Sequence, residues 1–341
     1  MSRKINTASH HFSAISRIAQ YWLSIGCFFL AVISSHALAK DNNVVRVAMS
    51  TTPLSSPFII ASEKGYFKEL GVNVEIKQVK GGNLAFKSLI SGEADIATSS
   101  EAVVMFNSFK RNDFSIFSTF VTSDNDVKIL ARRDSGINKI SDLKGKKVGT
   151  IIGTSAHFFL NHTLLMNGVS ENDVYISKLK PQEAKKILED KKLDAIVTWE
   201  PYAYLAHKEL GDAVKIVEHD RLYVETFNAI SMKEYADKNE KTLVKITQAL
   251  MKAIQFIKDK PETTQKIVAK ALDKELHVIR STWSDFLFSV GLNQWLLTSM
   301  EAEARWAIKH DLIKAKKLPN YMNYINTKPL NISAPDKITI Y

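Results

Sequence analysis

The amino-acid sequence predicts an α/β protein with two lobes, each built on a parallel sheet flanked by helices. Short apolar strands alternate with helices at the spacing of βαβ units. This order occurs twice, and each copy has a short helix leading into an acid and an apolar strand, SLISGEADIATSS in the first and KILEDKKLDAIVTWE in the second. Right-handed crossovers place the loops at the carboxyl ends of the parallel strands, where open α/β sheets bind ligands. Two such halves side by side predict a ligand-binding cleft between them.

The first half is expected to present three loops to this cleft: Ser50–Pro57, the turn Gly81-Gly82-Asn83, and Ser99-Ser100-Glu101. Gly65 should break its first helix. The expected elements are a strand over Val44–Met49, a helix over Phe58–Leu70, a strand over Val72–Val79, a helix over Leu84–Ser91, a strand over Ile96–Thr98 and a helix over Ala102–Lys110.

The second half should present the turn Gly153-Thr154-Ser155 and the segment Trp199-Glu200-Pro201-Tyr202. The expected elements are a strand over Lys147–Ile152, a helix over His157–Asn167, a strand over Val174–Leu179, a helix over Pro181–Asp190 and a strand over Ala195–Thr198.

The turn Gly153-Thr154-Ser155 is a candidate anion site. A strand that feeds such a turn into a helix leaves backbone N–H groups, hydroxyls and the positive end of the helix dipole facing open space. The alternative is that Thr154 or Ser155 only caps the helix.

The connections between the halves, Asp126–Arg133 and Leu222–Ser231, contain β-rich runs and are candidate hinge strands. We therefore expect one lobe over residues 40–130 plus 223–341 and the other over 131–222. Residues 233–317 show helical periodicity and should pack as a helical C-terminal extension on the first lobe. Residues 318–341 contain three prolines and are expected to form an extended tail.

Residues 1–39 have the features of an export signal. Basic residues without acids precede the apolar run Trp22–Ile33, and Ala37-Leu38-Ala39 matches a small-residue cleavage site. Cleavage after about Ala39 would remove Cys27, the only cysteine, together with three basic residues. The mature chain would then carry 43 Lys and Arg against 36 Asp and Glu, a net charge of +7. A periplasmic, disulfide-free protein follows; an uncleaved anchor is the competing interpretation.

Several function classes lack support in the sequence. The basic residues are interleaved with acids and form no stripe with stacking aromatics, so we expect no nucleic-acid partner. The chain contains no HExxH, G-x-S-x-G, P-loop or G-x-G-x-x-G motif, and its nine histidines show no metal-ligand spacing. We therefore expect neither an enzyme nor a cofactor or metal.

Four segments together resemble the extracytoplasmic solute-binding proteins of ABC importers, in the branch serving nitrate, sulfonates, taurine and thiamine-pyrimidine precursors. They are PFIIASEKGYFKELGVNVE, GGNLAFKSLISGEADIATSS, ARRDSGINKISDLKGKKVGTIIGTSAHFFL and LDAIVTWEPY. The resemblance implies a type II periplasmic binding protein, or Venus-flytrap, fold with two Rossmann-like lobes joined by two crossing strands. It also implies a monomer that delivers a small molecule to a membrane permease with a cytoplasmic ATPase.

Carried over residue by residue, the family's ligand contacts correspond to Thr51, Thr52, Pro53, Gly82, Asn83, Ser99, Ser100, Glu101, Thr154, Ser155, His157, Trp199 and Glu200. His157 either donates to an anion or is an exposed first-turn histidine.

Glu200 bears on the ligand's chemistry. A carboxylate in the cleft would repel a simple anion but suit a ligand with an amino group or a heterocyclic N–H; alternatively Glu200 points away or pairs with a lysine. Trp199 and Tyr202 could stack on a flat ring. A taurine-like sulfonate is the favoured ligand, a pyrimidine precursor the alternative, and a periplasmic ligand sensor the alternative role.

Overall fold

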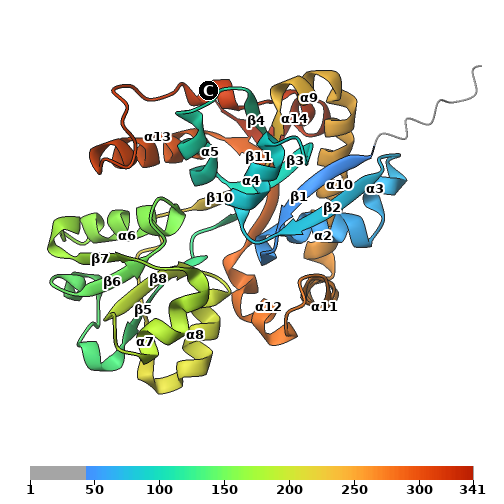
Figure 1. Cartoon of the computed structure of the whole chain (residues 1–341). Coiled ribbons are helices and arrows are strands. Elements are labelled where there is room, and N and C mark those ends of the chain that lie inside the picture. The colour runs from blue at the N-terminus through green and yellow to red at the C-terminus, as the bar shows by residue number, and fades with distance from the viewer. Residues whose placement is uncertain (1–43, 341) are drawn as a thin grey trace, which may run out of the picture. The chain divides into compact units, whose positions relative to one another are not determined.

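Two sheets organise residues 44–340, the part of the chain that the computed structural model describes (Figure 1). Within these residues, a seven-stranded sheet has the order β12-β11-β4-β10-β3-β1-β2 and a five-stranded sheet the order β7-β6-β8-β5-β9. The expected export signal, residues 1–39, lies outside the described residues.

The first βαβ half matches its prediction closely. β1 lies between β2 and β3 and is parallel to both. Its elements are β1 (Val45–Ser50), η2 (Pro53–Ser55), α2 (Ser56–Glu63), α3 (Tyr66–Glu69), β2 (Val74–Val79), α4 (Gly82–Ile90), β3 (Ile96–Ser100) and α5 (Glu101–Ser108). Gly65 breaks the first helix as expected, with a left-handed φ of 73° that a side chain would disfavour. The first loop is shorter than expected because α2 already begins at Ser56.

The second half repeats this topology, with β6 parallel to β7 and β8 on either side. Its elements are η3 (Arg133–Ser135), η4 (Ile140–Leu143), β6 (Lys147–Thr150), α6 (Ser155–Met166), η5 (Glu171–Asp173), β7 (Tyr175–Lys178), η6 (Pro181–Glu183), α7 (Ala184–Glu189), β8 (Ala195–Trp199), α8 (Tyr202–Leu210), η7 (Gly211–Ala213) and β9 (Val214–Val217). The internal repeat read from the sequence is thus a repeat in structure.

The connections between the sheets differ from the expected hinge strands. β4 (Phe114–Ser123), which the sequence analysis missed, and β10 (Glu225–Met232) pair antiparallel in the seven-stranded sheet. β5 (Val127–Arg132) pairs only with β8 and β9 in the five-stranded sheet. The chain therefore crosses through residues 124–126 and returns through residues 218–224, both outside the strands.

The C-terminal region is helical except for one strand. Its elements are α9 (Lys233–Lys238), α10 (Glu240–Asp259), α11 (Pro261–Ala271), α12 (Leu276–Thr282), η8 (Trp283–Asp285), β11 (Leu287–Asn293), α13 (Gln294–Lys309), η9 (Tyr321–Tyr324), α14 (Lys328–Ser333), η10 (Pro335–Lys337) and β12 (Ile338–Thr339). β11 corrects the all-helical prediction, because its alternating burial suits an added strand beside β4. The expected extended tail is also wrong in part, since Tyr321, Tyr324 and Leu330 are buried and anchor it.

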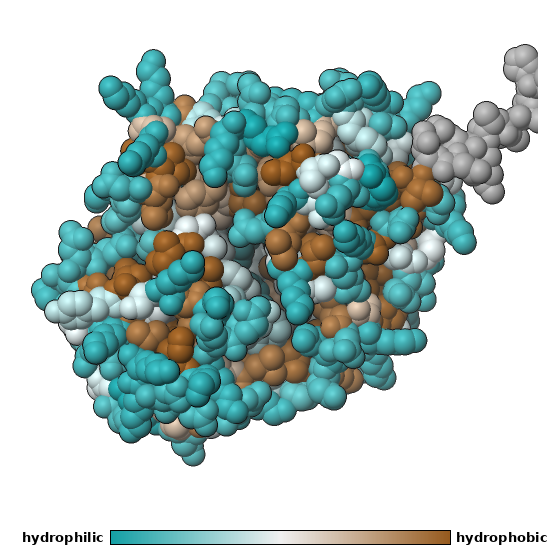
Figure 2. Space-filling model, in the orientation of Figure 1, coloured by the Kyte–Doolittle hydropathy of each residue, from teal (hydrophilic) through white to brown (hydrophobic). Residues whose placement is uncertain are grey.

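The core of the seven-stranded sheet is rich in aromatic rings. Phe120 on β4 is fully buried and packs edge-on against Phe58, at 5.2 Å between ring centroids, and against Phe227, at 5.9 Å. The face of the protein shown in Figure 2 is mainly hydrophilic, with apolar residues in small groups. Across the described residues, none of the helices combines the length and apolar character needed to span a bilayer.

Candidate functional site

A cavity of about 250 Å³ is lined by residues from both sheets. From the seven-stranded sheet come the loop after β1, the start of α4 and the start of α5; from the five-stranded sheet come the turn before α6 and the segment between β8 and α8. These are the carboxyl-terminal ends of parallel strands, where the sequence analysis expected a cleft. A larger open groove, of about 650 Å³, lies between the end of α5 and residues 315–324 and contains none of the predicted site residues.

Most of the predicted ligand contacts line the cavity. They are Thr51, Thr52, Gly82, Asn83, Ser100, Thr154, Ser155, Trp199 and Glu200. Tyr202, considered as a stacking residue, lines it as well. Gly82 is closely packed, because a Cβ there would lie 2.5 Å from the Ser99 Oγ and 3.1 Å from the Ser99 Cα, so that Ser99 would have to shift.

Four predicted contacts do not line the cavity: Pro53, Ser99, Glu101 and His157. Ser99 lies on β3 underneath the start of α4, and its hydroxyl is buried. Pro53 is the first residue of η2 and is buried.

Glu101 is fully buried behind the cavity. Its carboxylate accepts hydrogen bonds from the Tyr223 hydroxyl at 2.7 Å and from the backbone N–H of Thr226 at 2.7 Å. The side chain thus ties the start of α5 to the return crossing and to β10.

His157 is neither an exposed residue nor an anion donor in the cavity. Its ring is buried, with Nε2 3.2 Å from the Glu171 Oε1 and with Trp306 packed edge-on at 4.9 Å. Glu171 also lies 3.1 Å from the Nδ1 of His310 at the end of α13. Burial opposes ionisation of Glu171, but the two histidines hold its pKa below the ordinary value.

The hydroxyls of the expected anion site have neighbours within the protein. The Thr154 Oγ1 donates to the Ile151 carbonyl at 2.6 Å, which orders the turn before α6. The Ser155 hydroxyl lies near the Glu225 carboxylate and opposes the rise in its pKa. An anionic ligand group would therefore meet the backbone at the start of α6, where the His157 N–H already donates to the Thr154 carbonyl at 3.1 Å, and would have Glu225 nearby.

Comparison with known proteins places the chain in a family. Residues 52–264 match the family model described as NMT1/THI5 like. The chain belongs to the NMT1/THI5-like family. A Bacillus subtilis relative that carries the name of an aliphatic sulfonates-binding protein is 27% identical over 274 residues, covering 78% of this chain and 81% of its own. A Brachyspira hyodysenteriae relative named as an ABC transporter periplasmic binding protein is 24% identical over 256 residues, covering 70% of this chain and 72% of its own.

Solved structures agree on the fold. The periplasmic aliphatic sulphonate binding protein of Escherichia coli superposes with a TM-score of 0.73 at 19% identity, covering 83% of this chain and 97% of the other. The two-lobed α/β prediction is therefore confirmed: this NMT1/THI5-like chain has a type II periplasmic binding protein fold. The desulfurization enzyme DszB shares the fold, with a TM-score of 0.68 at 13% identity over 86% of this chain and 99% of its own. The curated relatives are named as binding proteins.

Glu200 lines the cavity and is almost fully buried. Its Oε2 accepts the backbone N–H of Tyr204 at 2.9 Å, in the first turn of α8. Burial raises the pKa of Glu200 to about 7, while this hydrogen bond and the charge of Lys128 oppose the rise.

Asp126 and Glu225 also line the cavity, and the sequence analysis did not select them. They flank the two crossings, one directly before β5 and the other at the start of β10. Burial and a neighbouring carboxylate raise the pKa of both, with Glu200 acting on Asp126 and Asp126 acting on Glu225. The sequence contained a signal for these two acids: each stands beside a run of strand-forming residues, Asp126 in DVKIL and Glu225 in VETF.

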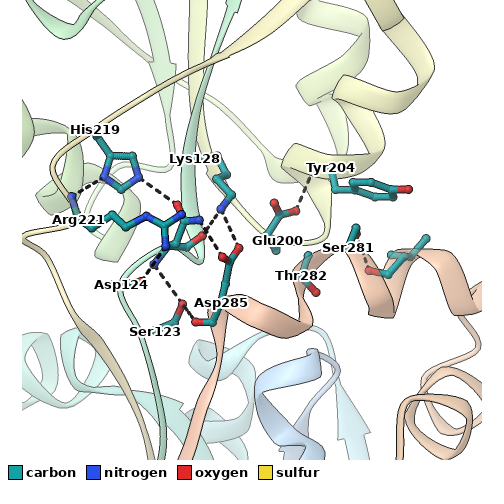
Figure 3. A network of polar contacts seen from close by, with 12 residues as sticks. Ser123, Asp124, Lys128, Glu200, Tyr204, His219, Arg221, Ser281, Thr282 and Asp285 are labelled. Atoms are coloured by element: carbon teal, nitrogen blue, oxygen red, sulfur yellow. Dashed lines mark hydrogen bonds and ion pairs between the residues drawn. The ribbon is translucent and has the colours of Figure 1, made fainter. Parts of the chain in front are cut away.

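A polar network holds the crossing next to Asp126 (Figure 3). Lys128 on β5 donates to the Asp285 Oδ2 at 2.9 Å and to the Asn125 carbonyl at 2.5 Å. The Asn125 side-chain amide donates to the other Asp285 oxygen at 2.8 Å, and its oxygen lies 3.2 Å from the His219 ring. Because Asp285 belongs to η8, the network connects the five-stranded sheet to the C-terminal region.

Within residues 44–340, no group of three or more histidine, cysteine, aspartate or glutamate side chains is arranged to hold a metal ion.

Proposed function

We propose that this protein is the periplasmic solute-binding component of an ABC importer and that it captures a small zwitterionic ligand, with a taurine-like sulfonate favoured. The observation that carries the proposal is the cavity lined by residues from both sheets, since a ligand there can contact both and favour their closed arrangement. Family membership and the names of the relatives support the solute-binding role.

The cavity offers both ends of such a ligand a polar partner. A sulfonate would accept from the first-turn N–H groups of α6, and an amine would donate to Glu200. In this proposal the contacts are those predicted residues that line the cavity, together with Tyr202.

The wider role follows from the same proposal. The chain is exported, loses residues 1–39 by cleavage after about Ala39, and acts as a monomer that passes its ligand to a membrane permease served by an ATPase. It binds without catalysis, unlike the fold's desulfurization enzyme DszB.

A thiamine-pyrimidine precursor or similar heterocycle is the second candidate ligand. The aromatic rings of Trp199 and Tyr202 line the cavity beside Glu200, an arrangement suited to a flat ring with an N–H donor.

The test is a thermal-shift panel on protein expressed as the full-length chain and purified after export. The panel contains alkanesulfonates, taurine, nitrate, phosphonates, aminopyrimidines and amino acids. A ligand at a hundredfold its Kd should stabilise the protein by about 2.7 kcal/mol. Stabilisation by taurine or a related aminosulfonate supports the favoured ligand, stabilisation by an aminopyrimidine alone supports the second candidate, and a panel without any shift contradicts both. N-terminal sequencing of the exported protein tests cleavage after about Ala39.

Transport is distinguished from sensing by the gene's neighbours. Co-transcribed permease and ATPase genes support delivery to an importer, whereas a neighbouring sensor kinase gene would favour a periplasmic ligand sensor.

A further inference from the structure

Two buried carboxylates at the cavity have an oxygen without a partner. Asp126 is 3% exposed and Glu225 is 6% exposed, and both line the cavity. Within residues 44–340, neither the Asp126 Oδ1 nor the Glu225 Oε2 has a hydrogen-bond partner. A buried polar atom without a partner costs free energy, more so when it carries charge, so such oxygens are expected where a ligand completes the site.

Glu200 supplies a third carboxylate to the same cavity. Its hydrogen bond from Tyr204 occupies one oxygen, Oε2. The three acids come from different places: Asp126 from the outward crossing, Glu225 from the first position of β10, and Glu200 from the position directly after β8. A group bound among them would contact the outward crossing and both sheets.

Few positive charges balance these acids. The charge of Lys128 acts on both Asp126 and Glu200, but its ammonium is bound to Asp285 and to a backbone carbonyl. His219 belongs to the same network, since its Nε2 lies 3.2 Å from the Asn125 Oδ1 (Figure 3). Among the residues that line the cavity, Lys80 is the one with a cationic side chain, and it is exposed.

This charge distribution disfavours a ligand that is only an anion. A sulfonate placed among these acids in a poorly solvated cavity would be repelled by each one that is ionised. A cationic nitrogen would instead favour the ionised form of all three acids and would give the unpartnered oxygens their donors. Trp199, Tyr202 and Phe227 also line the cavity, and aromatic rings attract cations.

We infer that the ligand carries a cationic nitrogen group, an ammonium or an amidinium, that is bound by Asp126, Glu200 and Glu225. This inference rests on the proposed solute-binding function and specifies its ligand: the cationic group is the required element, and an anionic group elsewhere on the ligand is secondary. An aminosulfonate, a diamine and a protonated aminopyrimidine all contain the required group, whereas a simple alkanesulfonate does not.

Calorimetric titration with matched compounds tests the inference on the exported full-length product. Taurine is compared with ethanesulfonate, which lacks the amine, and with isethionate, which replaces it by a hydroxyl. Putrescine, agmatine and an aminopyrimidine identify which cationic scaffold is preferred. We expect at least one amine to bind, at least about tenfold more tightly than its amine-free partner.

The variants Asp126→Asn and Glu225→Gln keep the shape of the side chains and remove the charge. Each should weaken binding of the amine by at least about tenfold. Asp124→Asn is the matched control, because Asp124 lies in the same crossing but does not line the cavity. It should leave the affinity unchanged.

The ligand-free melting temperature provides a second measurement that needs no ligand. If the two carboxylates lack a counter-ion until a cationic ligand binds, Asp126→Asn and Glu225→Gln should raise the melting temperature of the ligand-free protein. If they have a structural role instead, both variants should lower it, and the inference is overturned.

The outcomes separate this inference from the proposed function. Tight binding of an amine-free sulfonate, or equal binding of taurine and ethanesulfonate, overturns the cationic requirement and leaves solute binding intact. If nothing in either panel binds at millimolar concentration, the proposed function fails, and the melting temperatures of the two variants still decide whether the carboxylates await a cation.

Discussion

Replacing Glu200 by glutamine should stabilise the ligand-free protein at alkaline pH. Glutamine has the same shape and keeps an oxygen for the Tyr204 N–H, so the main change is the loss of a buried charge. The folded-state pKa of Glu200 is raised from the ordinary 4.5 to about 7, chiefly by burial.

The sign and size follow from proton linkage. An acid with a raised pKa binds more protons in the folded state than in the unfolded state, so stability falls as the pH rises between the two pKa values. The shift from 4.5 to about 7 corresponds to about 3 kcal/mol of lost stability once the pH exceeds 7. At pH 5 the loss is about 1 kcal/mol, because this pH is only slightly above the ordinary pKa of 4.5 that applies to the unfolded state.

The assay is urea unfolding of wild type and Glu200→Gln at pH 5 and pH 8. We expect the variant's advantage to grow by about 2 kcal/mol between the two pH values. Glu63→Gln makes the same chemical change at an exposed position of α2 and should show no such growth. An advantage that is absent at pH 8, or that is the same at both pH values, would refute the assignment of a raised pKa to Glu200.

Three further predictions concern packing and ion pairs. Gly82→Ala should destabilise the protein by about 1–3 kcal/mol, because the new Cβ would lie 2.5 Å from the Ser99 Oγ. Thermal melting should show a smaller loss of stability when Ser99→Ala is added. If Gly82→Ala costs the same stability with and without Ser99→Ala, the contact is not the cause. Glu171→Gln should cost about 1–3 kcal/mol at pH 7. Because the folded-state pKa of Glu171 is lowered, the stability advantage of the wild type over the variant should shrink as the pH falls through that pKa. Urea unfolding at acidic pH checks this, and an undiminished advantage argues against the ion pair. Phe120→Ala should cost about 3–5 kcal/mol in chemical unfolding, since the ring is fully buried between two others; a cost below about 1 kcal/mol would exclude the proposed core.

The sequence alone determined the repeated βαβ order and the edge of each sheet, the carboxyl-terminal ends of the parallel strands, at which the loops of the site lie. Local signals carry this information: apolar runs of strand length, helical periodicity, and turns such as the one at Gly65. Parallel strands and right-handed crossovers then leave little freedom in where the loops lie. The turns that contain Asn83 and Ser155 therefore line the cavity as expected.

The tertiary structure decided the partners of the polar side chains. Ser155 was expected to bind an external anion, but its hydroxyl meets Glu225, which lies seventy residues further along the chain. His157 follows the same turn and yet faces Glu171 and Trp306, because the helical twist after Ser155 carries its side chain away from the cavity. β11 was likewise not readable as a strand, since its edge position beside β4 depends on a distant partner.

The chemistry of the cavity also depends on long-range contacts. Asp126 and Glu225 are about a hundred residues apart in the sequence, and only the pairing of β4 with β10 and of β5 with β8 brings both beside Glu200. Lys128 would be the natural counter-ion by proximity, but Asp285 from the C-terminal region binds it. Local sequence predicted where the site is; burial and long-range ion pairing determine its charge, because both depend on residues that meet only in the folded chain.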